Sequence, residues 1–264
     1  MLGTFRRRNL YSELGIFWNG ARGRERVVRS PLIQRLEHAG VLSDVEQNAL
    51  QALTHTFRAV EARRNITPIH HTDIVHVIMS GIACRYKILV SGARRIAHYL
   101  LPGDLCEVHA SAQYPSDWSL AALTPCSVVD IVRERMTEVA EVHQGIAHAL
   151  WWATLVDLSI AREWLANDSR PAPKRQAHLF CELLVRMQAV GLACQNSFKL
   201  GLTQGDLADA TAISHVHMNR VLQELRHRSL IVLENGQLTI PDVLKLSAFG
   251  EFNPGYLHLN NKLT

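Results

Sequence analysis

The stretch that decides the fold is ISHVHMNRVLQELRHRSLIVLENGQLTI, residues 213–240. Ser214 is a typical helix N-cap, and Ile213 before it can pack onto Met218 at the fourth helical position. Spacings of three and four residues give the following helix two different sides. The apolar side contains Met218, Val221, Leu222 and Leu225, and the opposite side contains Val216, Asn219, Arg220 and Gln223, with His215 at the N-terminal end.

Two further signals surround this helix. Downstream, an Asn-Gly pair at 235–236 separates two β-rich runs, 231–234 and 237–240, and this is the strongest short signal for a type I′ hairpin. Upstream, Thr203 and Asp206 have the spacing of a capping box and begin a second short helix. Two short helices joined by a tight turn, with a hairpin behind them, predict a winged helix-turn-helix.

The polar side of the second helix suits the recognition of bases. Arginine fits the O6/N7 pair of guanine, and asparagine or glutamine fits adenine. A polar helix face alone is usually only solvated, so the prediction depends on the combination of caps, turn and hairpin. The residues that we predict to contact DNA are Thr203, Gln204, Ser214, His215, Val216, His217, Asn219, Arg220 and Gln223.

The first half of the chain has a different period. Runs at 74–79, 82–88, 95–100 and 127–132 are rich in β-formers and are separated by turn signals such as Ser-Gly and Pro-Gly. Short strands at this spacing predict a small antiparallel sandwich or barrel. Before them, Pro31 begins one amphipathic segment, and a capping box at 43–46 begins another.

A long helical pattern, 138–166, joins the two halves. Its apolar residues alternate spacings of three and four over about three heptads, which is what a two-stranded helix contact requires. We predict pairing with a second copy, and packing on its own domain remains the alternative. A Pro-rich linker is expected at 167–173, followed by a helix at 174–190. The seam residues are Val139, Val142, Ile146, Ala149, Ala153, Val156 and Ile160.

Composition bounds the class of protein. The chain has 264 residues, 47% hydrophobic and 20% charged, which suits about two globular domains. No apolar run approaches the roughly 20 residues that span a bilayer, and there is no secretory signal, so we expect a cytoplasmic protein. Five scattered cysteines without metal-ligand spacing are predicted to be free thiols, with a redox or iron–sulfur role as the alternative.

The first 30 residues are basic. Seven arginines against two glutamates give this stretch a charge of +5. We interpret 1–29 as a loosely ordered arm, which either contacts phosphate or an acidic surface or is a solvated leader.

Two stretches resemble the Crp-Fnr superfamily of bacterial transcription regulators. LTQGDLADATAISHVHMNRVLQELRHRSLI (202–231) is similar to its helix-turn-helix, and HVIMSGIACRYKILVSGARRIAHYLLPGDL (76–105) to its β-roll sensor. The resemblance covers roughly residues 30–248. It implies an α+β fold with a basic arm (1–29), an antiparallel, jelly-roll-like β-roll sensor (30–136), a dimerisation helix (137–168), a winged helix-turn-helix (169–248) and a tail (249–264).

The resemblance also implies a homodimer on a palindromic site, with bases contacted from His215, Val216, Asn219 and Arg220. Only Arg220 keeps the common family residue, so the operator is expected to differ from that of better-known members. Ala212 occupies a turn position where the family usually has glycine; if that position needs a positive φ, alanine costs about 1 kcal/mol.

The sensor departs from the cyclic-nucleotide-binding members. Glu107 stands where those members have a ribose-binding acid, but no arginine lies between Arg95 and Arg133. A buried cyclic phosphate without a cation is poorly compensated, so cyclic AMP is not the expected effector. Residues 1–83 lack the clustered cysteines of the iron–sulfur branch. A haem or metal role for His70, His71 or His76 is the alternative to ordinary surface histidines.

These observations predict a sequence-specific DNA-binding transcription regulator, not an enzyme, with no cofactor and no metal site. The chain has no nucleophile–base arrangement and no glycine-rich phosphate loop. The predicted partners are double-stranded DNA and a second copy, with RNA polymerase left open and no membrane. The alternative is a ligand- or partner-binding sensor whose helix-turn-helix contacts protein. DNA affinity measured against salt concentration separates the two.

Overall fold

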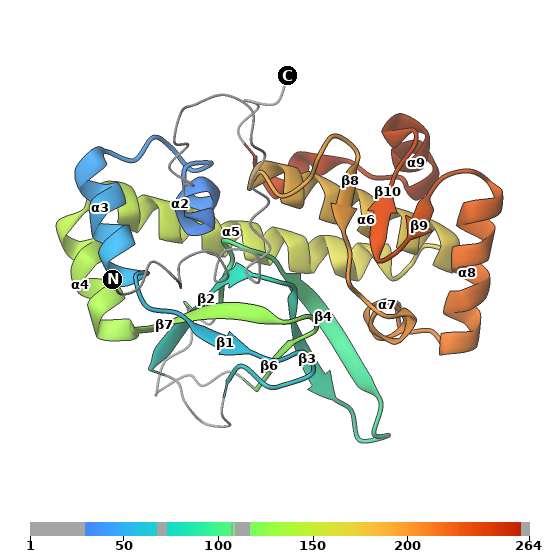
Figure 1. The fold of residues 1–264 in the computed structure, drawn as a ribbon, viewed down its shortest axis with the longest axis horizontal. Coiled ribbons are helices and arrows are strands. Elements are labelled where there is room, and N and C mark those ends of the chain that lie inside the picture. The colour runs from blue at the N-terminus through green and yellow to red at the C-terminus, as the bar shows by residue number, and fades with distance from the viewer. Residues whose placement is uncertain (1–29, 68–72, 107, 109–116, 260–264) are drawn as a thin grey trace, which may run out of the picture.

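In the computed structural model, the described residues are 30–67, 73–106, 108 and 117–259. The predicted basic arm 1–29 therefore lies outside them, as do Glu107, His70 and His71. Figure 1 shows a long central helix with β-strands below it and a helix-rich part on the right. None of the described helices is long and apolar enough to cross a membrane.

The N-terminal part is a β-roll of two antiparallel sheets beneath short helices. Helix α2 (Pro31–Leu36) starts at the predicted proline, and α3 (Asp44–Leu53) starts at the predicted Ser43–Glu46 capping box. The strands predicted from the period of two are confirmed to within a residue or two at their ends. The first sheet has the order β1 (Arg58–Val60), β7 (Cys126–Val132), β2 (Ile74–Ser80), β5 (Leu105–Cys106), and the second β4 (Arg94–Leu100), β3 (Ala83–Ile88), β6 (Ser119–Ala122).

The predicted continuous helix over 138–166 is wrong at its start. It is divided at His143 into α4 (Arg133–Val142) and α5 (Gln144–Asn167). The backbone of Gly145 in the first turn of α5 donates to Glu46 of α3, with 2.9 Å between its nitrogen and Oε1. The new helix therefore begins against the N-terminus of α3.

Four of the seven predicted seam residues face the chain's own core, so the predicted pairing through them is wrong; Val142 is exposed, and Val139 and Ala153 are half-buried. Ile146, Ala149, Val156 and Ile160 are buried within the single chain. They pack against the β-roll, α2 and the C-terminal part, which is the alternative interpretation of the pattern. A different side of α5 is open to solvent at spacings of three and four, and we call it the α5 stripe: His148, Trp151, Leu155, Leu158, Arg162 and Leu165.

The C-terminal part begins almost at once after α5. Helix α6 (Ala172–Ala189) starts before the predicted residue 174, so the linker is only 168–171. Two short helices, α7 (Gln204–Thr211) and α8 (His215–His227), are followed by α9 (Val243–Gly250) and the 3₁₀ turn η1 (Pro254–Leu257).

The predicted wing hairpin is confirmed. Strands β9 (Val232–Glu234) and β10 (Gln237–Thr239) pair antiparallel. The turn residues Asn235 and Gly236 both have positive φ, 50° and 75°, as a type I′ turn requires. The sequence did not predict β8 (Ser197–Lys199), which adds a third strand beside β10.

Candidate nucleic-acid interface

Helix α8 has one packed side and one open side. The Ser214 side chain accepts a hydrogen bond from the backbone of His217, so the predicted cap is present. The predicted core stripe, Met218, Val221, Leu222 and Leu225, is buried. All nine residues predicted to contact DNA are exposed: Thr203, Gln204, Ser214, His215, Val216, His217, Asn219, Arg220 and Gln223.

The helix before it is capped as predicted. The Thr203 hydroxyl oxygen accepts from the backbone of Asp206, and the backbone of Thr203 donates to the Asp206 carboxylate. The helix ends at Ala212, whose φ of 51° lies in the left-handed region. The turn therefore does need a positive φ at the position where an alanine stands.

The two helices present one continuous polar surface. The Asn219 amide donates to the side-chain oxygen of Gln204 over 3.4 Å. A Cβ added at Gly205 would lie 3.2 Å from the His215 ring, so the missing side chain lets the start of α8 approach α7 closely. Residues from the starts of both helices thus lie side by side on the solvent face.

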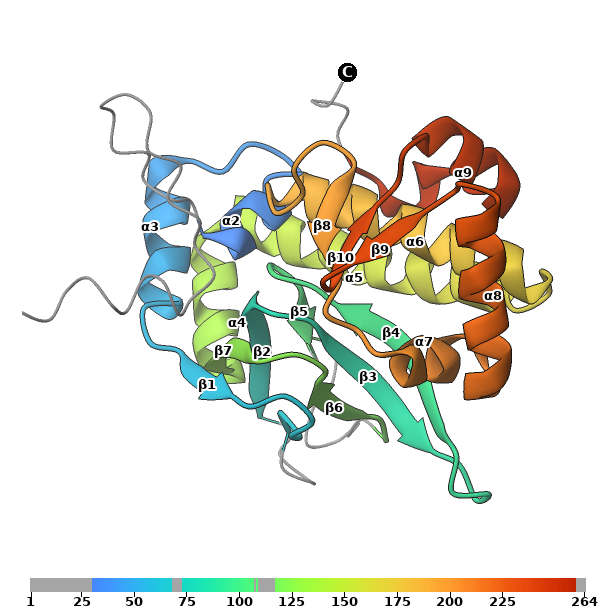
Figure 2. The ribbon, with the colours of Figure 1, turned by 45° about the vertical axis from the view of Figure 1, so that its right-hand side comes forward.

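Arginines of the β-roll hold α7 at both ends. At its start, Arg94 and Arg63 both pair with the buried Asp206 carboxylate. Near its end, Arg95 donates to the carbonyl of Ala210 over 2.9 Å. The Tyr99 hydroxyl also donates to the Asp206 carbonyl. In both views α7 lies beside β4, so the orientation of the helix-turn-helix is fixed against the β-roll (Figures 1 and 2).

The carboxylate of Asp206 is ionised although it is buried. Burial alone would raise its pKa, but hydrogen bonds from Arg63 and Thr203 outweigh burial and lower the pKa below its usual value. Nothing in the sequence predicted the pairs of Asp206 with Arg63 and Arg94, because these partners are more than a hundred residues apart.

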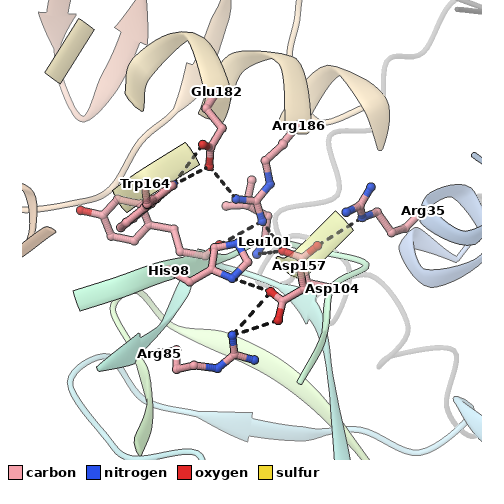
Figure 3. Close-up of polar contacts among 10 residues, drawn as sticks. Arg35, Arg85, His98, Leu101, Asp104, Asp157, Trp164, Glu182 and Arg186 are labelled. Carbon is pink, nitrogen blue, oxygen red and sulfur yellow. Dashed lines mark hydrogen bonds and ion pairs between the residues drawn. The ribbon is translucent and has the colours of Figure 1, made fainter. Parts of the chain in front are cut away.

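A second polar network joins α6 to the β-roll (Figure 3). Arg186 donates to Asp104 over 2.6 Å and to Glu182 over 3.0 Å. Arg35 of α2 pairs with the other oxygen of Asp104. Burial opposes ionisation of Asp104, yet the charges of the two arginines outweigh burial and lower its pKa. The network is therefore a set of compensated charges in the interior.

A third cluster lies between the β-roll and α5. Asp157 of α5 pairs with Arg85 of β3 and with His98 of β4. A small pocket adjoins it, lined in part by Thr154 and Arg35 as well. The His98 Nε2 atom is buried and has no hydrogen-bond partner.

The remaining candidates for metal or redox chemistry among the described residues are His76 and the cysteines. His76 is buried on β2 and bonded to Asp130, so it is not the surface histidine that we expected. Within the described ranges, no three His, Cys, Asp or Glu side chains are grouped so as to hold a metal ion. None of the five cysteines is in a disulfide, and burial raises the pKa of Cys84 to about 12 and of Cys126 and Cys181 to about 11.

Comparison with known proteins connects this geometry to a family. Residues 174–249 match the Crp-like helix-turn-helix domain. The nitrogen fixation regulation protein FixK of Azorhizobium caulinodans is 25% identical over 164 residues, covering 62% of this chain and 65% of FixK. The transcriptional activator protein FnrL of Cereibacter sphaeroides is 26% identical over 166 residues, covering 61% of this chain and 66% of FnrL. These matches thus span just under two thirds of either relative.

Solved structures have the same fold. FixK2 from Bradyrhizobium japonicum aligns with a TM-score of 0.65 at 21% identity, over 74% of this chain and 96% of that one. A CooA mutant from Carboxydothermus hydrogenoformans aligns with a TM-score of 0.56 at 15% identity, over 80% of this chain and 98% of that one. The capped helix pair, the hairpin behind it, the β-roll and these likenesses agree: residues 174–249 are a Crp-like helix-turn-helix domain, and the chain as a whole is similar to the Crp-Fnr superfamily of transcription regulators.

Proposed function

We propose that the chain is a sequence-specific DNA-binding transcription regulator that reads a palindromic operator as a homodimer. The observation behind this proposal is the exposed polar side of α8, directly opposite the side that packs into the helix-turn-helix. A helix held in this way can enter a major groove with its N-terminal end first. A cytoplasmic location follows for such a regulator, and RNA polymerase would be a further partner.

The exposed residues divide into two roles. Arg220 suits a bidentate contact to guanine, Asn219 and Gln223 suit adenine, and Val216 suits the methyl group of thymine. His215 and His217 lie at the groove-entering end. Thr203, Gln204 and Ser214 lie at helix N-termini, where backbone N–H groups favour phosphate oxygens, and would set the position of the protein on the duplex.

The homodimer would form along the α5 stripe. Trp151 and Leu165 on this stripe are 62% and 75% exposed, which is unusual for side chains of their size in a closed surface. Their heptad spacing is what pairing of two α5 helices requires. The proposed domain boundaries stay as predicted: the β-roll sensor is 30–136, the dimerisation helix 137–168 and the winged helix-turn-helix 169–248. The pairing contacts would be confined to α5.

The effector of the β-roll would enter the pocket beside α5. The two arginines that line this pocket, Arg35 and Arg85, are already paired with Asp104 and Asp157. A cyclic phosphate would have to compete with these carboxylates, which supports an effector other than cyclic AMP. Glu107 is proposed as an effector contact on the family resemblance alone.

DNA binding can be tested with fluorescent duplexes. Selection from a random pool should enrich an inverted repeat. Log affinity for that duplex should fall steeply with log salt, by about 10³–10⁵ in affinity between roughly 50 and 200 mM if 6–10 phosphates are contacted. A triple variant, Asn219→Ala, Arg220→Ala and Gln223→Ala, should keep most of the salt dependence but lose the enrichment. A flat salt dependence of the wild type would instead favour a protein partner for α8.

A further inference from the structure

The chain after α9 folds back onto α5 and α6. Residues 251–259, which we call the strap, lie beyond the segment that matches the Crp-like domain. In Figure 1 this chain returns along α6. Its turn η1 contacts both α5 and α6. The strap therefore touches the dimerisation helix and the first helix of the DNA-binding part at once.

Apolar and aromatic packing attaches the strap to α6. The ring of Tyr256 stacks on His178, with 6.0 Å between centroids, and Phe252 meets the same ring edge-on at 5.1 Å. Leu257 is buried in the large core cluster. At the beginning of the strap, Glu251 pairs with Lys174 and Arg170. These two residues lie where α5 passes into α6 through the linker 168–171, and we call this junction the elbow. The strap is therefore held on α6 by ring packing, a buried leucine and ion pairs.

One buried carboxylate connects the strap to α5, α6 and the β-roll. Glu182 of α6 is fully buried and accepts from the Tyr256 hydroxyl over 2.7 Å. It also accepts from the Trp164 indole of α5 over 3.0 Å and from Arg186, which reaches the β-roll. Burial, together with the Glu182 charge, raises the Tyr256 pKa, so the hydroxyl stays protonated and donates.

We propose that the strap fixes the angle between α5 and α6 and thereby sets which half-site spacing the dimer accepts, with Phe252, Tyr256 and Leu257 as positioning residues. This inference rests on the proposed function. In a dimer paired along α5, each α8 reaches DNA across the four-residue linker 168–171. One inserted base pair rotates a half-site by about 34° around the duplex axis. A stiff elbow cannot follow that rotation, whereas a loosened one can.

The test uses the full chain and duplexes carrying the half-site selected with the wild type, at the selected spacing or with one base pair inserted or removed. The wild type should lose about tenfold or more in affinity when the spacing changes, about 1.4 kcal/mol. The double variant Phe252→Ala and Leu257→Ala should reduce that loss to about threefold or less, while its affinity for a single half-site stays within about twofold. The milder Tyr256→Phe variant removes only the hydroxyl. Its loss of affinity on changed spacing should lie between that of the wild type and that of the double variant.

The control is Leu246→Ala, which removes a buried leucine from α9 rather than from the strap. It should lower thermal stability but keep the wild-type spacing preference. If the double variant keeps the full spacing penalty, or if Leu246→Ala relaxes spacing equally, the strap inference is wrong while the proposed function stands. If the wild type binds neither half-sites nor full sites, the proposed function fails first.

Discussion

The guanidinium of Arg94 on β4 donates to the carboxylate of Asp206 at the start of α7, with 2.9 Å between Nη2 and Oδ1. The other oxygen of the same carboxylate accepts from the Thr203 backbone and completes the cap of α7. A single side chain thus both begins the helix-turn-helix and attaches it to the β-roll. A change in β4 position would be transmitted directly to the helix on which α8 packs.

Removal of Arg94 should weaken this attachment. Arg94→Ala leaves Arg63 as the one arginine paired with the buried Asp206 carboxylate, so we expect a loss of about 1–3 kcal/mol in the free energy of unfolding, measured by urea titration. The control is Arg64→Ala, because this arginine, next to Arg63 in the sequence, has a side chain that is 75% exposed and an ion pair with the equally open Glu61. It should change stability by no more than about 0.5 kcal/mol. Equal effects of the two variants would contradict the role of Arg94.

A glycine at position 212 should stabilise the protein. Ala212 has a φ of 51°, which alanine adopts at a cost that glycine does not pay. We expect Ala212→Gly to raise the free energy of unfolding by about 0.5–1 kcal/mol. Ala161→Gly, at an exposed position inside α5, should lower it by about 1 kcal/mol. A destabilised Ala212→Gly variant would mean that the turn is not strained.

Acid should destabilise the protein in part through Asp157. Burial opposes ionisation of this carboxylate, but the charges and hydrogen bonds of His98 and Arg85 outweigh burial and hold its pKa far below the usual range. The folded pKa is thus lower than the unfolded value of about 3.9, so the stabilisation is present above pH 4 and is lost as the pH falls below it.

Asp157→Asn lacks this titration. The variant should be less stable than the wild type at pH 7, yet its urea midpoint should fall less between pH 5 and pH 3. Glu138→Gln, which alters an exposed pair with Arg135 on α4, should leave the acid dependence as in the wild type. Parallel pH profiles for wild type and Asp157→Asn would rule out this contribution.

Local signals predicted the helix-turn-helix and its hairpin well. The Ser214 cap, the Thr203–Asp206 capping box and the Asn235–Gly236 turn each depend on residues at most three apart. Their conformations follow from hydrogen bonds and backbone sterics within one turn, so the sequence alone defines them. The buried side of α8 followed from its spacing of three and four.

The interior of the molecule could not be predicted in this way. Helix α5 has two rows with heptad-like spacing, one through Ile146 and Val156 and one through Leu155 and Leu158. Periodicity reports that a side is apolar but not which partner covers it. Likewise, the pair Arg94–Asp206 joins residues 112 apart, and no local pattern marks it. The packing of the whole fold decides which partner covers each row of α5 and which distant residues pair.

The α5 stripe gives a direct test of dimerisation. Leu155→Glu combined with Leu158→Glu should convert the dimer to a folded monomer in sedimentation, because both side chains are open to solvent in the single chain. The control Leu244→Glu, at an exposed leucine of α9, should stay dimeric. Ala149→Glu would be uninformative, since that alanine is buried in its own chain and a carboxylate there should unfold the protein. A persistent dimer in the double variant would place the interface elsewhere.

Arg220 is the sharpest test of sequence recognition. Its side chain is exposed on the polar side of α8, two residues from the buried Met218, so its removal leaves the packing intact. If it binds one guanine in each half-site, Arg220→Ala should lower affinity for the selected operator by about 1–3 kcal/mol and relax preference at one base position per half-site. Arg135→Ala on α4 removes the same charge far along the chain from α8 and should preserve the full base preference. A loss of affinity that is equal on every duplex would show that Arg220 contacts only the phosphate backbone, because a phosphate contact contributes without regard to sequence.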